Sequence, residues 1–195
     1  MLNIVLFGPP GAGKGTQAEK LIAKYKLCHL STGDIFRANI KGETELGKLA
    51  KNYMDKGELV PDSVTIAMLE SEVNKNPTAQ GFIFDGFPRT TPQAEALATF
   101  LASKATDISV MLALDVKEDE LIKRLLARGA DSGRADDKDT NIIANRIKVY
   151  NEQTAVVADF YANQGKFEKI HGVGTKDEIF SKLCDAIKKF DNGSI

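Results

Sequence analysis

The segment Gly8–Thr16, which reads GPPGAGKGT, constrains the fold of this chain more than any other feature. It follows the apolar run Asn3–Phe7 and opens Lys14–Tyr25, a stretch with apolar residues at helical spacing. A glycine-rich turn between a buried strand and a helix lets backbone N–H groups face phosphate oxygens, and Lys14 adds positive charge. The hydroxyl comes one place later than in the strict pattern, because Gly15 follows Lys14. The segment predicts a nucleotide-binding P-loop; a strand-to-helix turn that binds nothing is the alternative.

Strand-like and helix-like patterns alternate from end to end. Short apolar runs predict buried strands at Asn3–Phe7, Cys28–Leu30, Phe82–Phe84, Ser109–Leu114 and Lys166–Ile170. Amphipathic stretches between them predict helices, for example at Glu118 to Ala127. We therefore expect an α/β fold, a P-loop doubly wound parallel five-stranded sheet with helices on both faces.

Two stretches interrupt this alternation. From Ser31 to Val60 one helical pattern follows another, with Gly42, Gly47 and Gly57 between them, which predicts an inserted helical subdomain. From Gly129 to Asp137 the sequence GADSGRADD has no apolar periodicity and predicts an exposed, mobile loop.

Capping signals mark two of the later helices. Pro92 follows Thr91 as a first-turn proline after an N-cap, and Thr175 with Glu178 predicts a capping box for the last helix.

Composition narrows the function classes. With 195 residues, 43% of them hydrophobic, the chain has material for one core domain with small insertions. Its 26 Lys and Arg against 27 Asp and Glu argue against nucleic-acid binding as the main function. No apolar stretch is long enough to span a membrane, and MLNIVLF lacks the basic start of a signal peptide. Cys28 and Cys184 suit core thiols in a reducing compartment, so a cytoplasmic protein is expected.

The arginines are few and sit in unusual contexts. The chain has six, at Arg37, Arg89, Arg124, Arg128, Arg134 and Arg146. A guanidinium holds phosphate oxygens through a planar fork and stays charged when desolvated, whereas lysines serve equally well on a solvated surface. Arg89, Arg128 and Arg134 lie next to Gly or Pro, which favours a multi-phosphate site over six separate surface residues. Arg124 and Arg146 look like ordinary helix-face residues on sequence alone.

The chain resembles the adenylate kinases, which belong to the nucleoside monophosphate kinases, over essentially its whole length. The motifs that carry the resemblance are GPPGAGKGT at Gly8–Thr16, STGDIFR at Ser31–Arg37, GELV at Gly57–Val60, DGFPRTTPQA at Asp85–Ala94, SGRADD at Ser132–Asp137 and GTK at Gly174–Lys176. The resemblance implies a P-loop core (1–30, 61–127 and 138–195), an AMP-binding subdomain (31–60) and a short lid (128–137).

The resemblance also implies which residues bind. ATP would be held by Gly11, Ala12, Gly13, Lys14, Gly15, Thr16, Arg124, Arg128, Gly174 and Lys176. AMP would be held by Thr32, Arg37, Glu58, Leu59, Val60, Gly86, Phe87, Pro88, Arg89, Gln93, Arg134 and Arg146. The catalytic set would be Lys14, Asp85, Arg89, Arg128, Arg134 and Arg146. The spacing from Arg134 to Arg146 is one residue longer than is usual in the family.

The expected reaction is the reversible transfer ATP + AMP = 2 ADP, which balances the adenine nucleotides. Mg²⁺ would arrive with ATP and be held through phosphates and water, with Thr16 and Asp85 as the nearest protein groups. Asp85 could instead cap or salt-bridge the adjacent loop. Structural zinc is not expected, because the four lid cysteines of long-lid relatives are missing.

The remaining polar residues leave alternatives open. An AMP phosphate oxygen is already anionic near neutral pH, so no general base is needed, and His29 and His171 are expected to be structural. Asp136 and Asp137 either pair with arginines or belong to a solvated loop.

Rival functions are a UMP/CMP kinase, a GTP-operated switch and an inactive adenine-nucleotide sensor. UMP/CMP kinases tend to carry Ala at the position of Thr32 and Asn at that of Thr90, which favours AMP here. The chain lacks the Asn-Lys-x-Asp motif of guanine recognition, since Asn74-Lys75 is followed by Asn76 and Pro77. Lys14, Arg89, Arg128 and Arg134 occur together, which argues against a sensor. We expect a monomer whose partners are ATP, AMP and ADP.

Overall fold

The computed structural model describes residues 1–190, and within this range five strands form one parallel sheet. The strands are β1 (Leu2–Phe7), β2 (Cys28–Ser31), β3 (Gly81–Asp85), β4 (Val110–Asp115) and β5 (Phe167–His171). Their order is β2-β3-β1-β4-β5, so β1 lies at the centre, with Ile4 opposite Ile83 on one side and Val110 on the other. The five predicted strands and the parallel sheet are confirmed.

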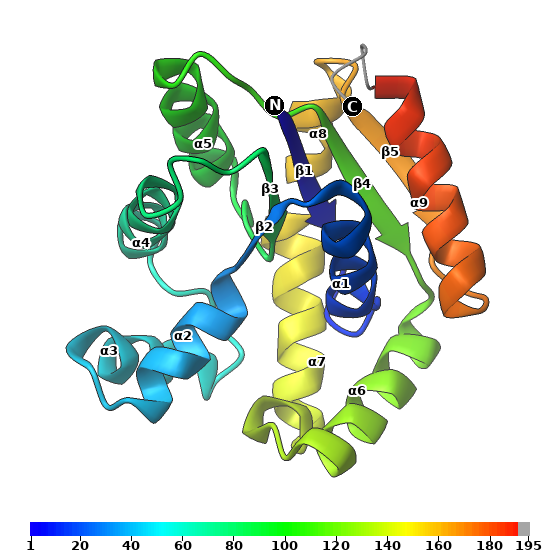
Figure 1. Ribbon diagram of the computed structural model, residues 1–195. Coiled ribbons are helices and arrows are strands. Elements are labelled where there is room, and N and C mark those ends of the chain that lie inside the picture. The colour runs from blue at the N-terminus through cyan, green and yellow to red at the C-terminus, as the bar shows by residue number, and fades with distance from the viewer. Residues whose placement is uncertain (191–195) are drawn as a thin grey trace.

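Helices cover both faces of the sheet, as Figure 1 shows. Side chains alternate along a strand, so Ile4 and Leu6 of β1 enter one core while Val5 and Phe7 enter the other. The first core is completed by α1 (Lys14–Tyr25), α6 (Glu118–Ser132), α7 (Thr140–Val149) and α9 (Lys176–Phe190). The second is completed by α4 (Asp62–Asn74), α5 (Thr91–Ser103) and α8 (Val157–Ala162). This is the doubly wound arrangement that the alternating pattern predicted.

The predicted helical insertion consists of α2 (Thr32–Lys41) and α3 (Glu45–Met54), which extend past the carboxyl ends of the strands (Figure 1). They share a small hydrophobic cluster with the start of α4, built on Phe36, Ala50, Val60 and Met68. The prediction that Gly47 separates two helices is wrong, because it lies inside α3. A Cβ there would stand 2.1 Å from the Asn39 carbonyl oxygen, so Gly47 permits α2 and α3 to pack closely.

The predicted exposed loop at Gly129–Asp137 is also partly wrong. The helix α6 continues to Ser132, and Ala135–Asp137 form a 3₁₀ turn before α7. Gly129 is buried in the helix, where a Cβ would lie 2.4 Å from the Asp137 carbonyl oxygen. The glycine therefore marks a close backbone approach between helix and turn rather than a break in the helix.

The capping predictions are confirmed with one shift. Glu178 accepts a bond from the Thr175 N–H at 2.7 Å, and Thr175 Oγ1 accepts one from the Glu178 N–H at 3.2 Å, which is the predicted capping box. The N-cap of α5 is Thr90 rather than Thr91, because the Thr90 hydroxyl accepts the Gln93 N–H.

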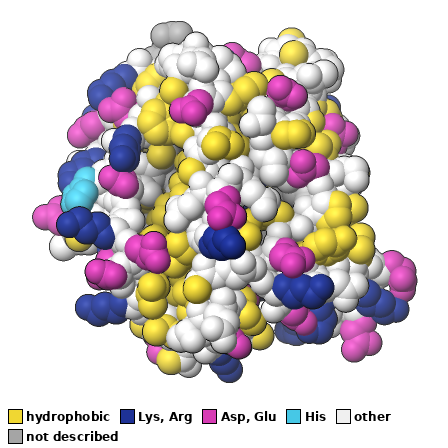
Figure 2. All heavy atoms as spheres, turned by 180° about the vertical axis from the view of Figure 1, so that it is seen from behind, with side chains coloured by type: hydrophobic (Ala, Val, Ile, Leu, Met, Phe, Trp, Pro, Cys, Tyr) yellow, Lys and Arg dark blue, Asp and Glu magenta, His cyan; other side chains and the backbone are white. Residues whose placement is uncertain are grey.

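The surface and the cysteines complete the description. Both cysteines are free thiols, Cys184 buried and Cys28 partly buried. On the face in Figure 2 positive and negative side chains are interspersed among hydrophobic ones. Within residues 1–190, no helix combines the length and the apolar character that a bilayer span requires. A π-helical turn at Tyr150–Thr154 lies between α7 and α8.

Candidate active site

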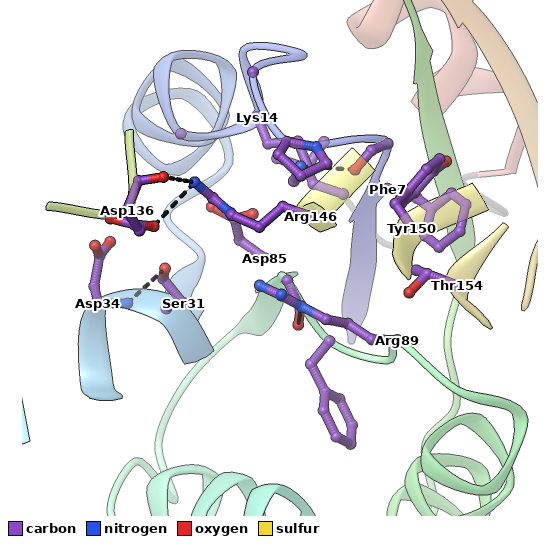
Figure 3. A pocket seen from close by; sticks show the side chains of 18 of the residues that line it. Phe7, Lys14, Ser31, Asp34, Asp85, Arg89, Asp136, Arg146, Tyr150 and Thr154 are labelled. Atoms are coloured by element: carbon purple, nitrogen blue, oxygen red, sulfur yellow. Dashed lines mark hydrogen bonds and ion pairs between the residues drawn. The ribbon is translucent and has the colours of Figure 1, made fainter. Parts of the chain in front are cut away.

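A cavity of about 620 Å³ lies beyond the carboxyl ends of the central strands, between the P-loop, the α2–α3 insertion and the α6–α7 segment. The chain passes from β1 to β2 and β3 on one side of β1 and then crosses from β3 to β4 on the other side, and crevices in open α/β sheets form where the connections diverge. Figure 3 shows Lys14, Asp85, Arg89 and Arg146 pointing into this space from different elements.

The P-loop forms one wall of the cavity. Gly8 has a φ of 139°, and a Cβ there would lie 2.8 Å from the Leu114 carbonyl oxygen, so only glycine allows β1 to turn against β4 at this point. The Lys14 ammonium donates to the carbonyl oxygens of Gly8 at 2.8 Å and Pro9 at 3.0 Å. Burial lowers the pKa of Lys14 to about 8, although the negative charge of Asp85 opposes the shift. A phosphate arriving here would restore charge balance around Lys14.

Every arginine of the chain lines this cavity, namely Arg37, Arg89, Arg124, Arg128, Arg134 and Arg146. Two of them, Arg124 and Arg146, are the ones whose sequence context alone suggested ordinary helix faces. Burial lowers the pKa of Arg89 to about 10, and the nearby Arg146 charge adds to the shift. Such a concentration of guanidinium groups is costly without anions, and planar guanidinium forks are suited to phosphate oxygens.

Asp137 holds two of these arginines. Its carboxylate accepts from Arg128 Nε at 2.6 Å and Arg128 Nη2 at 3.0 Å, and from Arg146 Nη1 at 2.6 Å. Burial by itself would raise the pKa of Asp137, but the bonds and charges of the two arginines outweigh it and hold the pKa below its usual range. Asp136 also pairs with Arg146, at 3.0 Å. The pairing alternative for these two aspartates is thus confirmed.

Asp34 joins the segment between α6 and α7 to the helical insertion. Asp34 accepts from Arg37 at 2.5 Å and lies 3.4 Å from Arg134 Nη2. Arg37 and Arg134 come from segments almost a hundred residues apart, and Asp34 brings both guanidinium groups to the same edge of the cavity.

Asp85 ends β3 and is 9% exposed at the centre of the site. The Nε2 atom of His29 lies 3.5 Å from its Oδ2 atom, so His29 belongs to the cavity wall, which the sequence reasoning missed. Asp85 caps neither neighbouring helix, since Ser31 and Thr90 do so. Within residues 1–190 no group of three His, Cys, Asp or Glu side chains could hold a metal ion. Asp85 and Thr16 both line the cavity, and a carboxylate with a hydroxyl is a donor set that fits Mg²⁺, which keeps water and phosphate ligands.

The predicted AMP residues divide between the wall and the layer behind it. The wall contains Arg37, Glu58, Leu59, Gly86, Phe87, Pro88 and Arg89. Thr32 is buried behind it and donates to the Gly86 carbonyl oxygen at 2.9 Å, and Gln93 accepts the Arg89 N–H at 2.8 Å. Val60 is also buried outside the wall.

The predicted ATP residues divide similarly. The wall contains Gly11, Gly13, Lys14, Gly15, Thr16, Arg124 and Arg128, while Ala12 is buried behind it. Gly174 and Lys176 are exposed and lie outside the cavity wall. They are nevertheless tied to the P-loop helix, because Gln17 Nε2 donates to the Lys176 carbonyl oxygen at 3.1 Å. Arg124 similarly donates to the Gly172 carbonyl oxygen at 3.2 Å.

Several wall residues were given no binding or catalytic role by the sequence reasoning, including Phe7, Glu19, His29, Asp34, Met54, Tyr150 and Thr154. His29 lies in the short strand β2, two residues before its carboxyl end at Ser31, the end where ligands gather in parallel sheets. No local signal marks Tyr150 and Thr154, which reach the cavity from the π-helical turn.

The model of the family described as adenylate kinase matches residues 6–166. The chain belongs to the adenylate kinase family.

Adenylate kinases from several bacteria are similar over nearly the whole chain. The adenylate kinase of Flavobacterium psychrophilum is 60% identical over 187 residues, which cover 96% of this chain and 98% of that protein. The adenylate kinase of Bacteroides thetaiotaomicron is 53% identical over 189 residues, covering 97% and 100%. The adenylate kinase of Porphyromonas gingivalis is 45% identical over 190 residues, covering 97% of each chain. The predicted family resemblance is confirmed.

Proposed function

We propose that this chain catalyses the reversible transfer of a phosphoryl group from ATP to AMP, giving two ADP, and so balances the adenine nucleotides. The observation that carries the proposal is the convergence of Lys14 and all six arginines on one cavity between a P-loop and a helical insertion. Two phosphate-bearing substrates that react with each other need this much positive charge in one place. Membership of the adenylate kinase family supports the same reaction.

Each wall of the cavity takes one substrate in this proposal. The backbone of Gly11–Thr16 and the Lys14 ammonium hold the ATP phosphates at the start of α1, with Arg124 and Arg128 beside them. The backbone of Gly174 and Lys176, tied to α1 through the bond from Gln17 to the Lys176 carbonyl oxygen, would meet the ATP base. On the opposite wall, Arg37 and Arg89 hold the AMP phosphate. The Glu58–Val60 backbone, together with Thr32 and Gln93 from the layer directly behind the wall, would meet the AMP base.

Catalysis in this site consists of positioning and charge stabilisation. An AMP phosphate oxygen attacks the terminal phosphorus of ATP in line, the bond to the bridging oxygen breaks, and ADP leaves. Lys14, Arg89, Arg128, Arg134 and Arg146 spread the charge of the transferring group, and because the attacking oxygen is already anionic no side chain has to remove a proton.

Magnesium fits this site through one carboxylate and water. Mg²⁺ bound with ATP would neutralise phosphate charge during transfer. Asp85 and Thr16 are the protein groups placed to hold its water shell, since both line the cavity next to Lys14.

We also propose three functional parts and a cellular setting. The core is 1–30, 61–127 and 138–195, the AMP-binding subdomain is 31–60, and the lid is 128–137. Closure of subdomain and lid would exclude water, which would otherwise hydrolyse ATP. The setting is a reducing cytoplasm, which the two free thiols support, and the enzyme is a monomer in this proposal.

A coupled assay of ADP formation from MgATP with AMP, UMP, CMP and GMP tests the proposal. Rapid turnover with AMP and slow turnover with the others supports it. Equal rates with AMP and UMP would contradict the choice of AMP and leave only a general monophosphate kinase.

A further inference from the structure

Asp62 connects the helical insertion to the residues proposed to read the AMP base. It is the first residue of α4, directly after the insertion rejoins the core at Val60 and Pro61. Its Oδ1 atom accepts from Gln93 Nε2 at 2.8 Å, and its Oδ2 atom accepts from Thr90 Oγ1 at 3.0 Å. Neither partner is near in sequence, since Gln93 is 31 and Thr90 is 28 residues away. The two helices α4 and α5 pack against each other at this point.

The amide of Gln93 is thereby held in one orientation. Its Oε1 atom accepts the backbone N–H of Arg89 at 2.8 Å, while its Nε2 atom donates to Asp62. A carboxylate only accepts hydrogen bonds and a backbone N–H only donates them. Turning the amide over would place oxygen against oxygen and N–H against N–H, and Gln93 is only 2% exposed, so water could not relieve the mismatch. Each end of the amide keeps capacity for one further bond.

Orientation matters because an amide can recognise two opposite base edges. Adenine donates through its 6-amino group and accepts at N1, whereas hypoxanthine and uracil present an acceptor in place of that amino group and a donor in place of that ring nitrogen. A glutamine free to turn over matches either edge equally well. A glutamine fixed in one orientation matches only one of them.

We propose that Asp62 is a specificity-determining positioning residue, which selects adenine by fixing the amide of Gln93. This inference rests on the proposed function, in which Gln93 meets the AMP base. Thr90 completes the arrangement, since its hydroxyl donates to Asp62 and accepts the Gln93 N–H at 3.3 Å, which holds the carboxylate in place.

The test compares AMP with inosine monophosphate, because the two are of the same size and differ in the donor and acceptor at the base edge. The wild type should strongly prefer AMP in kcat/KM. In Asp62→Asn the new side chain can present either oxygen or NH₂, so only the Arg89 N–H still opposes turning the Gln93 amide over. The preference for AMP should then fall roughly tenfold, the scale of one neutral hydrogen bond with its desolvation, while the KM for ATP stays unchanged.

Two controls separate the positioning of Gln93 by Asp62 from the general effect of removing an acidic residue at the start of a helix. Asp119→Asn removes an exposed acid from the first turn of α6 and should change neither the preference nor turnover. In a Gln93→Leu background, adding Asp62→Asn should leave the preference as it is, because Asp62 acts through Gln93. Asp62→Ser, whose hydroxyl also donates or accepts, replaces Asp62→Asn if that variant does not fold.

The outcomes distinguish a failure of the inference about Asp62 from a failure of the proposed function. A fall in melting temperature with equal losses for AMP and inosine monophosphate would show that Asp62 is structural and overturn the inference. A further loss of preference in the Gln93→Leu background would overturn it too. A wild type without preference for AMP over UMP would instead overturn the proposed function.

Discussion

Arg128 and Asp137 form a two-pronged ion pair in which Asp137 is fully buried. The guanidinium uses Nε and Nη2 to reach both carboxylate oxygens, at 2.6 and 3.0 Å. Because the same carboxylate also binds Arg146, one aspartate orients two of the cavity's arginines. A buried charge of this kind is stabilising only while all its partners are present.

Asp137→Asn should lower both stability and activity. Removing the charge leaves Arg128 and Arg146 without their partner, and we expect a loss of about 3 kcal/mol in the free energy of unfolding at pH 7. The native pKa of Asp137 lies below the ordinary value of 3.8, so the stabilisation is complete above that pH and is lost as pH falls through the native pKa. The gap between wild type and variant should therefore close in acid.

Urea denaturation at pH 7 and below pH 3.8 measures this effect. Asp131→Asn, an exposed position of the same segment, is the control and should stay within about 0.5 kcal/mol of wild type. A pH-independent gap would show that packing rather than charge is responsible.

Lys14→Met should lower turnover by roughly three orders of magnitude without unfolding the protein, because the ammonium stabilises charge that develops during transfer. Burial holds the native pKa of Lys14 near 8, below the ordinary 10.5, so the charged form costs stability in the ligand-free enzyme below pH 8. The variant should melt at or above the wild-type temperature at pH 7, and the difference should shrink between pH 8 and 10.5. Turnover and melting curves measured across this pH range check both points. Near-normal turnover in the variant would contradict the role of Lys14 in charge stabilisation.

Arg89→Lys and Arg134→Lys should abolish most activity with little change in melting temperature. Lysine keeps the charge but loses the planar fork that binds two phosphate oxygens. In Arg89 the Nε atom also donates to the Gly86 carbonyl oxygen at 2.7 Å, which orients the guanidinium. Steady-state kinetics with calorimetry separates the two roles, since a large loss of stability with activity intact would favour a structural role.

Thr32→Ala and Arg37→Ala should separate base reading from phosphate holding. If Thr32 meets the base, its removal should narrow the preference for AMP over UMP by about 1–2 kcal/mol in relative kcat/KM. Truncating Arg37 should weaken every monophosphate about equally, because all share the phosphate. The opposite pattern, with Arg37→Ala changing the ranking, would exchange the two roles.

Local patterns in the sequence were enough to predict the strand, P-loop and helix at Asn3–Tyr25, the five parallel strands and the capping box of Thr175 and Glu178. Each of these depends on residues that are neighbours along the chain, so hydrophobic spacing and capping chemistry suffice. The motifs likewise identified the family and most of the cavity wall.

The tertiary structure alone decided what depends on distant residues. Gly47 and Gly129 look like helix breaks, but each lies inside a helix because another backbone passes within reach of its α-carbon. Arg124 and Arg146 look like ordinary helix-face residues in the sequence, but the fold places both in the cavity wall. Asp137, buried between α6 and α7, binds Arg146 there. The hydrogen bond between Asp62 and Gln93 joins residues 31 positions apart. No local pattern predicts it, because the two side chains become neighbours only when α4 packs on α5.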